Sequence, residues 1–494
     1  KLNWIWIIVL GVFFGSCEDY LNRSPNDGFS EDAVYKDYNS LSGFMDRIFL
    51  NNSILIYTYD INSYANQYVT VGNLSDEYAS VRNDDPSKFV NAGNWLENAG
   101  ARFEVGSKVG TATGNLGATA IARAYTGLRI VNRVINGVDK VQSITDEQKQ
   151  KLLGQAYFLR AYFYFEVIKR YGGMPIFDAL WGASDNFDLP RKTYQESNKW
   201  MQTDLDKAIE YLPTSWPEEE HGRPDKVAAL ALKSMTQLYA ASPLMQNDLN
   251  TIEDKGYGKE MAAEAARSAQ KTIDAIESHD YYRLMSHDEY RSIQLMPNSN
   301  QFAQPEYLWF LRWHPVNWSA YVRAQWLTQP YDDKTGAEGT PYNAPTQNMV
   351  DLFERMGDDG KYYPITDPRS GYDAVKTSHP YSNRDPRLAN NILVPGEQWG
   401  KNLQGVPYYT TTYSGGYSEY FISTNTFTNS SQQTGYMCKK FTWPEASVPL
   451  FGASGFERYR LVSVYIRVSQ VYLDMAEASY EATGSADALV EGWT

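Results

Sequence analysis

Two stretches of this 494-residue chain combine aromatic side chains with short polar ones, a mixture that suits a ligand rich in hydroxyl groups. In the first stretch, Trp95 stands among Asn94, Glu97 and Asn98, and the second runs from Trp309 to Tyr331. Aromatic ring faces pack against C–H groups, while Asn, Asp, Arg and Tyr side chains supply the donors and acceptors that hydroxyls need. Carried on loops over a rigid scaffold, such a surface could bind a glycan.

The same rings also have a simpler interpretation, because buried aromatic side chains dominate core packing. Aromatic residues make up 14% of the chain, including 13 Trp and 38 Tyr, so many of them must lie in the core. Trp309 lies in an alternating run that reads as a strand, and we expect it to be buried. Trp318 has a more loop-like context, and no helical period includes Trp95. Trp95 is therefore the strongest single candidate for a stacking platform.

Residue patterns for catalysis are scarce. The sequence has no His-Glu-x-x-His, Gly-x-Ser-x-Gly, phosphate-binding Gly-rich or Cys-x-x-Cys motif. Its five His residues are scattered, and we interpret them as surface or loop residues: His221, His279, His287, His314 and His379. Asp332, Asp333 and Glu338 could offer oxygen ligands to Ca²⁺ but lack an EF-hand spacing. We expect no catalysis, no metal and no other cofactor, with a surface glycoside hydrolase as the alternative, since a carboxylate pair is defined only in space.

Composition narrows the class of partner. Hydrophobic residues are 43% and charged residues 21% of the chain, as in globular proteins. The formal net charge is −14, which repels phosphate backbones, so nucleic acid is a poor partner.

The first residues resemble a bacterial lipoprotein signal. Lys1 precedes an apolar run from Leu2 to Phe14, too short to span a bilayer comfortably, and Gly15-Ser16 leads to a cysteine. We expect residues 1–16 to be removed, Cys17 to be acylated and residues 17–30 to form a tether; an ordinary signal peptide is the alternative. With only two cysteines in the chain, Cys438 then has no disulfide partner, and we expect it to be a buried small side chain.

The elements that must position the loops are helices, and the central one is expected over residues 145–171. Thr145 and Gln148 form a capping box at its start, and Gly172-Gly173 followed by Pro175 ends it. Apolar residues cover nearly its whole circumference, which indicates a buried helix. Arg160 and Glu166 interrupt that surface, and we expect both to be paired or snorkelling charges rather than ligand contacts.

Further helical patterns surround the central one. We expect helices over residues 31–50 with Ser30 as cap, 116–138, 193–212, 225–242, 259–279, 347–355 and 458–483. A weak repeat of Ala-rich and aromatic helices, each followed by a helix ending in Ala-Ile-Glu, resembles tetratricopeptide-type hairpins. Residues 51–114 and 284–454 lack a sustained period and read as loops with minor strands, for example at 417–423. We expect one domain over 31–494, with its scaffold mainly at 31–50, 115–280 and 458–483.

Six separated segments, in the expected order, resemble the SusD/RagB family of outer-membrane nutrient-binding lipoproteins. They are Cys17 to Leu21, Arg160 to Pro175, Gly222 to Ala241, Pro345 to Glu354, Arg384 to Arg387 and Ile466 to Ala478. No single segment is very specific, but the ordered set spans nearly the whole chain. The family usually continues beyond the last of these segments, so we expect the C-terminus to be truncated.

The resemblance implies a mainly α fold, in which a tetratricopeptide-like scaffold carries a large loop-rich, minor-β subdomain that binds ligand. It implies a lipid-anchored, non-catalytic lid at the cell surface that binds oligosaccharides, or peptides in some members, beside a SusC-like TonB-dependent transporter. It also joins the two aromatic stretches into one ligand face. The candidate ligand-binding residues on that face are Asp76, Arg82, Trp95, Asn98, Trp318, Trp326 and Tyr331.

Overall fold

The structure is a computed structural model. It describes residues 31–49, 75–80, 91–93, 120–182, 184–250, 253–289, 295–297, 304–311, 343–374, 376, 379–401, 407–409, 434–439 and 459–485.

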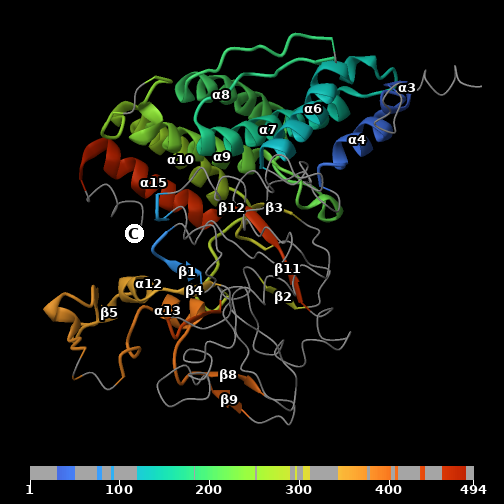
Figure 1. Cartoon of the computed structure of the whole chain (residues 1–494). Helices are drawn as coiled ribbons and strands as arrows, with labels where there is room; N and C mark the ends of the chain where they lie inside the picture. Colours follow the sequence, from blue (N-terminus) through green and yellow to red (C-terminus); the bar gives the residue numbers. More distant parts are fainter. Residues whose placement is uncertain are drawn as a thin grey trace, which may run out of the picture.

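Helices form one layer of the molecule, at the top of Figure 1. They are α3 (Glu31–Val34), α4 (Tyr38–Asp46), α6 (Ala120–Gly137), α7 (Asp146–Tyr171), α8 (Tyr194–Tyr211), α9 (Lys226–Ala241), α10 (Lys259–Glu277) and α15 (Val468–Thr483). Each helix from α6 to α10 packs against the next one in the chain, and α10 also packs against α15. This is the pattern of stacked helical hairpins, as the sequence predicts.

The predicted central helix is α7, and its ends are confirmed. Thr145 and Gln148 make both hydrogen bonds of the capping box, and Gly172 ends the helix with φ of +77°. Residues on every side of α7 are buried. Close packing against α6 requires Gly127, because a Cβ atom there would lie 2.2 Å from the ring of Phe163.

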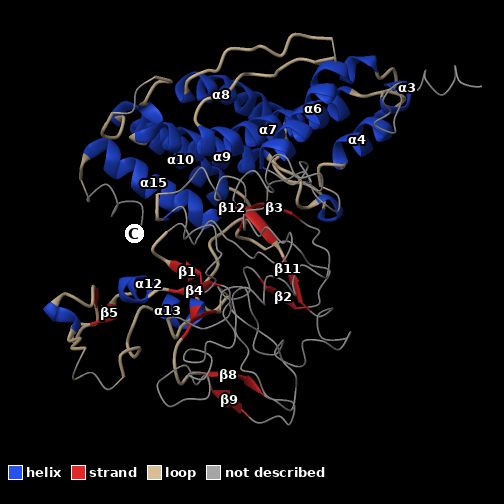
Figure 2. Ribbon diagram, viewed as in Figure 1, coloured by secondary structure: helices blue, strands red, loops and turns tan. Residues whose placement is uncertain are grey.

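Short strand pairs and helices form the second layer, below the first in Figure 2. The strands of the described ranges pair in six antiparallel two-stranded sheets. The pairs are β1 (Tyr78–Ser80) with β4 (Asn343–Pro345), β2 (Leu295–Pro297) with β11 (Tyr459–Leu461), β3 (Tyr307–Leu311) with β12 (Ser463–Arg467), β5 (Arg355–Met356) with β6 (Tyr362–Tyr363), β7 (Ile392–Leu393) with β10 (Met437–Cys438), and β8 (Gln398–Lys401) with β9 (Pro407–Tyr409). The short helices α12 (Gln347–Leu352) and α13 (Pro386–Asn391) lie among them.

The two layers meet at β3 and β12, where a cluster of aromatic rings packs against α7. Trp309 is 1% exposed, and its ring lies 4.8 Å from the rings of both Phe158 and Tyr162 on α7. The ring of Tyr465 on β12 lies 4.6 Å from that of Trp309 and also contacts Tyr162. The prediction that Trp309 is a buried strand residue is confirmed.

Three predicted helices are wrong in part. The one expected over 347–355 ends at Leu352, and Arg355 begins β5. The helix expected over 458–483 is wrong at residues 459–467, where β11 and β12 form instead. Val464 and Ile466 alternate along β12, which pairs with β3. The expected helix over 31–50 is broken between α3 and α4, where Asp37 adopts an extended conformation and its side chain caps α4 at the Ser40 N–H. The predicted strand at 417–423 lies outside the described residues.

Two smaller observations complete the fold. Cys438 on β10 is buried, as expected. Among the described residues, no helix combines the length and apolar character needed to cross a bilayer.

Candidate functional site

Of the seven candidate ligand-binding residues, only Asp76 lies in the described part of the chain. Arg82, Trp95, Asn98, Trp318, Trp326 and Tyr331 lie outside it, as does the candidate acylation site Cys17. Their roles remain predictions.

Asp76 is exposed at a junction between the two loop-rich regions. Its backbone carbonyl accepts a hydrogen bond from the Thr346 hydroxyl, across a separation of 270 residues. The Thr346 N–H donates to the carbonyl of Glu77 at 2.9 Å, and Tyr78 lies opposite Pro345 in the β1–β4 pair. The structure therefore brings a segment of the region 51–114 alongside a segment of the region 284–454 (Figure 1).

A network of hydrogen-bonded side chains around α12 stabilises this junction. The Thr346 hydroxyl also caps α12 by accepting from the Met349 N–H at 3.1 Å. Gln347, the first residue of α12, accepts from the Tyr436 hydroxyl at 2.7 Å. Arg384 is buried and donates to the backbone carbonyls of Val350 and Phe353 at 2.6 Å, and its burial lowers its pKa. Because these groups bond one another, they hold the junction and are not available to a ligand.

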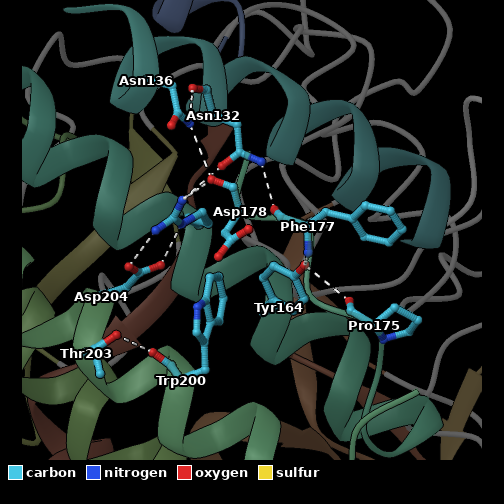
Figure 3. Close-up of polar contacts among 10 residues, drawn as sticks. Asn132, Asn136, Tyr164, Pro175, Phe177, Asp178, Trp200, Thr203 and Asp204 are labelled. Atoms are coloured by element: carbon cyan, nitrogen blue, oxygen red, sulfur yellow. Dashed lines mark hydrogen bonds and ion pairs between the residues drawn. The ribbon is translucent and has the colours of Figure 1, made fainter. Parts of the chain in front are cut away.

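The charges inside α7 are paired, as the sequence predicts. Both carboxylate oxygens of Asp204 accept from Arg160, at 2.6 and 2.7 Å, and the third arm of the guanidinium donates to Asn132 at 3.0 Å (Figure 3). Glu166 accepts from Lys169 and Arg170, both at 2.6 Å. Although burial opposes ionisation of Glu166, these two cations lower its pKa.

A cavity of about 590 Å³ opens where the helical layer meets β3. Its walls come from the segment before α9, including Trp216 and His221, and from the segment after α10, including Tyr281 and Tyr282. No three His, Cys, Asp or Glu side chains in the described ranges converge as a metal site would require. His221, predicted to be a surface or loop residue, lines this cavity, which no sequence pattern predicted. The available signal for a polar, aromatic site was the run of four such residues that follows α10, His279-Asp280-Tyr281-Tyr282.

A stacked-hairpin scaffold carrying a layer of loops and short strands defines the class of this protein, and the family follows from sequence comparison. A family model described as starch-binding, associating with the outer membrane, matches residues 35–239, and the SusD family model matches residues 275–491. Together they cover most of the chain, which belongs to the SusD/RagB family.

Solved structures share the fold at low sequence identity. A SusD-like protein from Bacteroides fragilis is 22% identical, with a TM-score of 0.67 over 95% of this chain and 80% of its own. A second protein from the same species, described as a SusD-like carbohydrate binding protein, is 19% identical, with a TM-score of 0.61 over 91% and 75%. A SusD superfamily protein from Bacteroides vulgatus is 15% identical, with a TM-score of 0.58 over 93% and 78%.

None of the curated proteins matches the chain. The structural relatives confirm the predicted mainly α, tetratricopeptide-like scaffold with its loop-rich, minor-β subdomain.

Proposed function

We propose that this protein binds oligosaccharides or polysaccharides at the cell surface, without cleaving them, on a face built by residues 51–114 and 284–454. The observation that carries the proposal is the junction of Asp76 and Glu77 with Thr346, since it joins the two loop-rich regions whose sequences contain the aromatic and polar stretches. The match to a family model described as starch-binding supports the ligand class.

On this face, Trp95 is the stacking platform, with Asp76 and Asn98 bonding nearby hydroxyls. Arg82 and the second aromatic stretch complete the surface through Trp318, Trp326 and Tyr331. Neutral glycans present both C–H faces and hydroxyl edges, so rings beside short polar groups can bind them without a strongly charged site.

A binding screen of the purified protein against polysaccharides and peptide mixtures tests the ligand class. We expect a polysaccharide to bind without new reducing ends. Trp95→Ala should weaken that binding by roughly 1–3 kcal/mol, or about tenfold to more than a hundredfold, with an unchanged melting temperature. Trp309→Ala is the buried counterpart and should instead lower the free energy of unfolding by roughly 3–5 kcal/mol.

Three results would each reject the proposal in a different way. Binding of peptides alone would indicate a peptide-binding lid of the same fold. New reducing ends would indicate a surface glycoside hydrolase. A sharply lowered melting temperature in Trp95→Ala, or undiminished binding to a confirmed polysaccharide, would make Trp95 a packing residue.

The glycan would pass to a SusC-like TonB-dependent transporter, for which the anchored protein acts as a lid on the outer membrane. The apolar run before Cys17 and the family description support this location. A single acyl chain binds membranes only marginally, so stable anchoring needs more than one. In native membranes, we expect co-purification with the transporter in mild detergent, and release of the Cys17→Ser variant from the membrane fraction. If the Cys17→Ser variant stays in the membrane fraction as fully as the parent protein, the prediction of a lipid anchor at Cys17 is wrong.

A further inference from the structure

The cavity beside β3 has aromatic walls and a size suited to a small ligand. Its volume of about 590 Å³ falls within the range of small-molecule sites, roughly 300–1,000 Å³. Tyr307 and Phe310 of β3 line one side. Tyr281 and Tyr282 line another, with ring centroids 5.6 Å apart in an edge-on arrangement, and His221 lies 5.9 Å from the ring of Tyr281.

The deeper polar groups of this cavity already bond within the protein. Asp225 is 2% exposed; one carboxylate oxygen accepts from the Ala228 N–H at 2.8 Å, and the other accepts from the Tyr282 hydroxyl at 2.5 Å. Arg223 forms a two-pronged pair with Asp46, at 2.6 and 2.9 Å. These groups stabilise the shape of the cavity, and hydrogen bonds within the protein satisfy their polar atoms.

His279 is also fully engaged. Its Nδ1 atom accepts from the Tyr281 N–H at 3.1 Å, and its Nε2 atom lies 3.2 Å from the Thr214 carbonyl. A neutral imidazole with the proton on Nε2 satisfies both contacts at once. His279 therefore fixes the position of the tyrosine segment.

Four polar side chains at the cavity wall behave differently. The imidazole of His221, the ammonium of Lys226, the carboxylate of Asp280 and the hydroxyl of Tyr281 have no hydrogen-bond or ion-pair partner within the described ranges. Tyr281 is 38% exposed, so its ring is accessible from solvent. The set offers donors and acceptors together, with one positive and one negative charge.

We propose that this cavity is a second carbohydrate site, which binds a mono- or disaccharide independently of the extended loop face. The aromatic walls would pack against the C–H faces of a sugar ring, and the four free polar groups would bond its hydroxyls. A neutral ligand fits best, because the charges of Lys226 and Asp280 cancel. The site contains none of the seven candidate ligand-binding residues of the proposed polysaccharide face, although the choice of ligand class rests on the proposed function.

Calorimetric titration of the full chain with maltose, cellobiose and N,N′-diacetylchitobiose tests the site. We expect at least one of these probes to bind, and Tyr281→Ala and Lys226→Met each to weaken it by about tenfold or more. Lys226→Met keeps the aliphatic stem, so it provides a second variant if loss of the Tyr281 ring disturbs folding. Tyr480→Ala removes a tyrosine of similar exposure, 45%, from α15 outside the cavity and should change nothing.

A parallel titration of Trp95→Ala separates this inference from the proposed function. Disaccharide binding that survives Trp95→Ala but not Tyr281→Ala supports the cavity, even if no polysaccharide binds the loops. The inference is overturned if none of the three probes binds the parent protein. It is equally overturned if the probe that binds is insensitive to both cavity variants.

Discussion

Arg160 lies inside the most buried helix of the protein, where an unpaired guanidinium would be strongly destabilising. Both oxygens of Asp204 and the amide oxygen of Asn132 surround it, so its charge and most of its donors are satisfied. Removing two ions from water is costly, and only such complete bonding offsets that cost. These bonds therefore link α6, α7 and α8. They account for the buried charge of Arg160 as a structural feature, so no ligand is needed to explain it.

The same network fixes the segment that follows α7. The Asn132 side chain donates to the Phe177 carbonyl at 2.8 Å, and the Tyr164 hydroxyl accepts from the Phe177 N–H (Figure 3). Burial of this hydroxyl raises the pKa of Tyr164 far above its usual value. Tyr164 therefore stays protonated and can also donate, to the Pro175 carbonyl at 3.3 Å.

At the scale of elements, β1, β4 and α12 form the junction between the two loop-rich regions, and Thr346 is its central residue. Thr346→Val keeps the shape of the side chain but removes the cap of α12 and the bond to the Asp76 carbonyl. We expect a loss of about 0.5–2 kcal/mol in the free energy of unfolding, as for other helix caps. We also expect weaker polysaccharide binding, because the two loop-rich regions lose a shared contact. Urea unfolding and calorimetric titration measure the two effects.

Thr193→Val is the matched control for Thr346→Val. Thr193 caps α8 by accepting from the Glu196 N–H at 3.1 Å, within the helical layer. Its loss should cost similar stability while polysaccharide binding is retained. Equal effects of the two variants on binding would mean that the junction does not organise the ligand face.

Elements with local signals were predictable from the sequence. The capping boxes at Thr145 and Thr193 are made by residues three positions apart, so the starts of α7 and α8 needed no tertiary information. The residues of β11 and β12 were taken for a helix because their strand character depends on pairing with β2 and β3, more than 150 positions earlier. Tertiary pairing outweighed the local pattern there.

The candidate sites show the same limit. The stretch around Trp95 was selected for its own composition, and only resemblance to a family joined it to a distant segment. The contact between Asp76 and Thr346 now supplies a physical link for one of the seven residues. The cavity was missed because its walls come from three segments, before α9, after α10 and in β3, each unremarkable by itself.

For the whole molecule, two buried carboxyl groups set the response to pH near neutrality. Burial raises the pKa of Asp225 to about 7, and burial likewise raises that of Asp474 to about 7. Between about pH 4 and 7, the folded protein keeps these protons, whereas the unfolded chain releases them. Folding is therefore favoured at low pH, and this stabilisation is lost as the pH rises through 7.

Other carboxylates act in the opposite direction, but in a more acidic window. Hydrogen bonds from Arg283 and Ser286 lower the pKa of Glu289 to about 2, and bonds from Arg369 lower that of Asp367 to about 2. Their contribution is present above about pH 4 and is lost as the pH falls toward 2. The two windows meet near pH 4 to 5, where the stability should be greatest.

We therefore expect the free energy of unfolding, measured by urea titration from pH 4 to 8, to fall as the pH rises from 5 to 7. Each buried proton contributes about 1.4 kcal/mol per pH unit, so Asp474→Asn should remove about half of that slope. Asp274→Asn is the control: Asp274 accepts from Gln270 as Asp474 accepts from Gln470, but it is exposed on α10, and its loss should leave the slope unchanged. A parent protein whose stability is constant or rises between pH 5 and 7 would show that these carboxyl groups are ionised in the folded state.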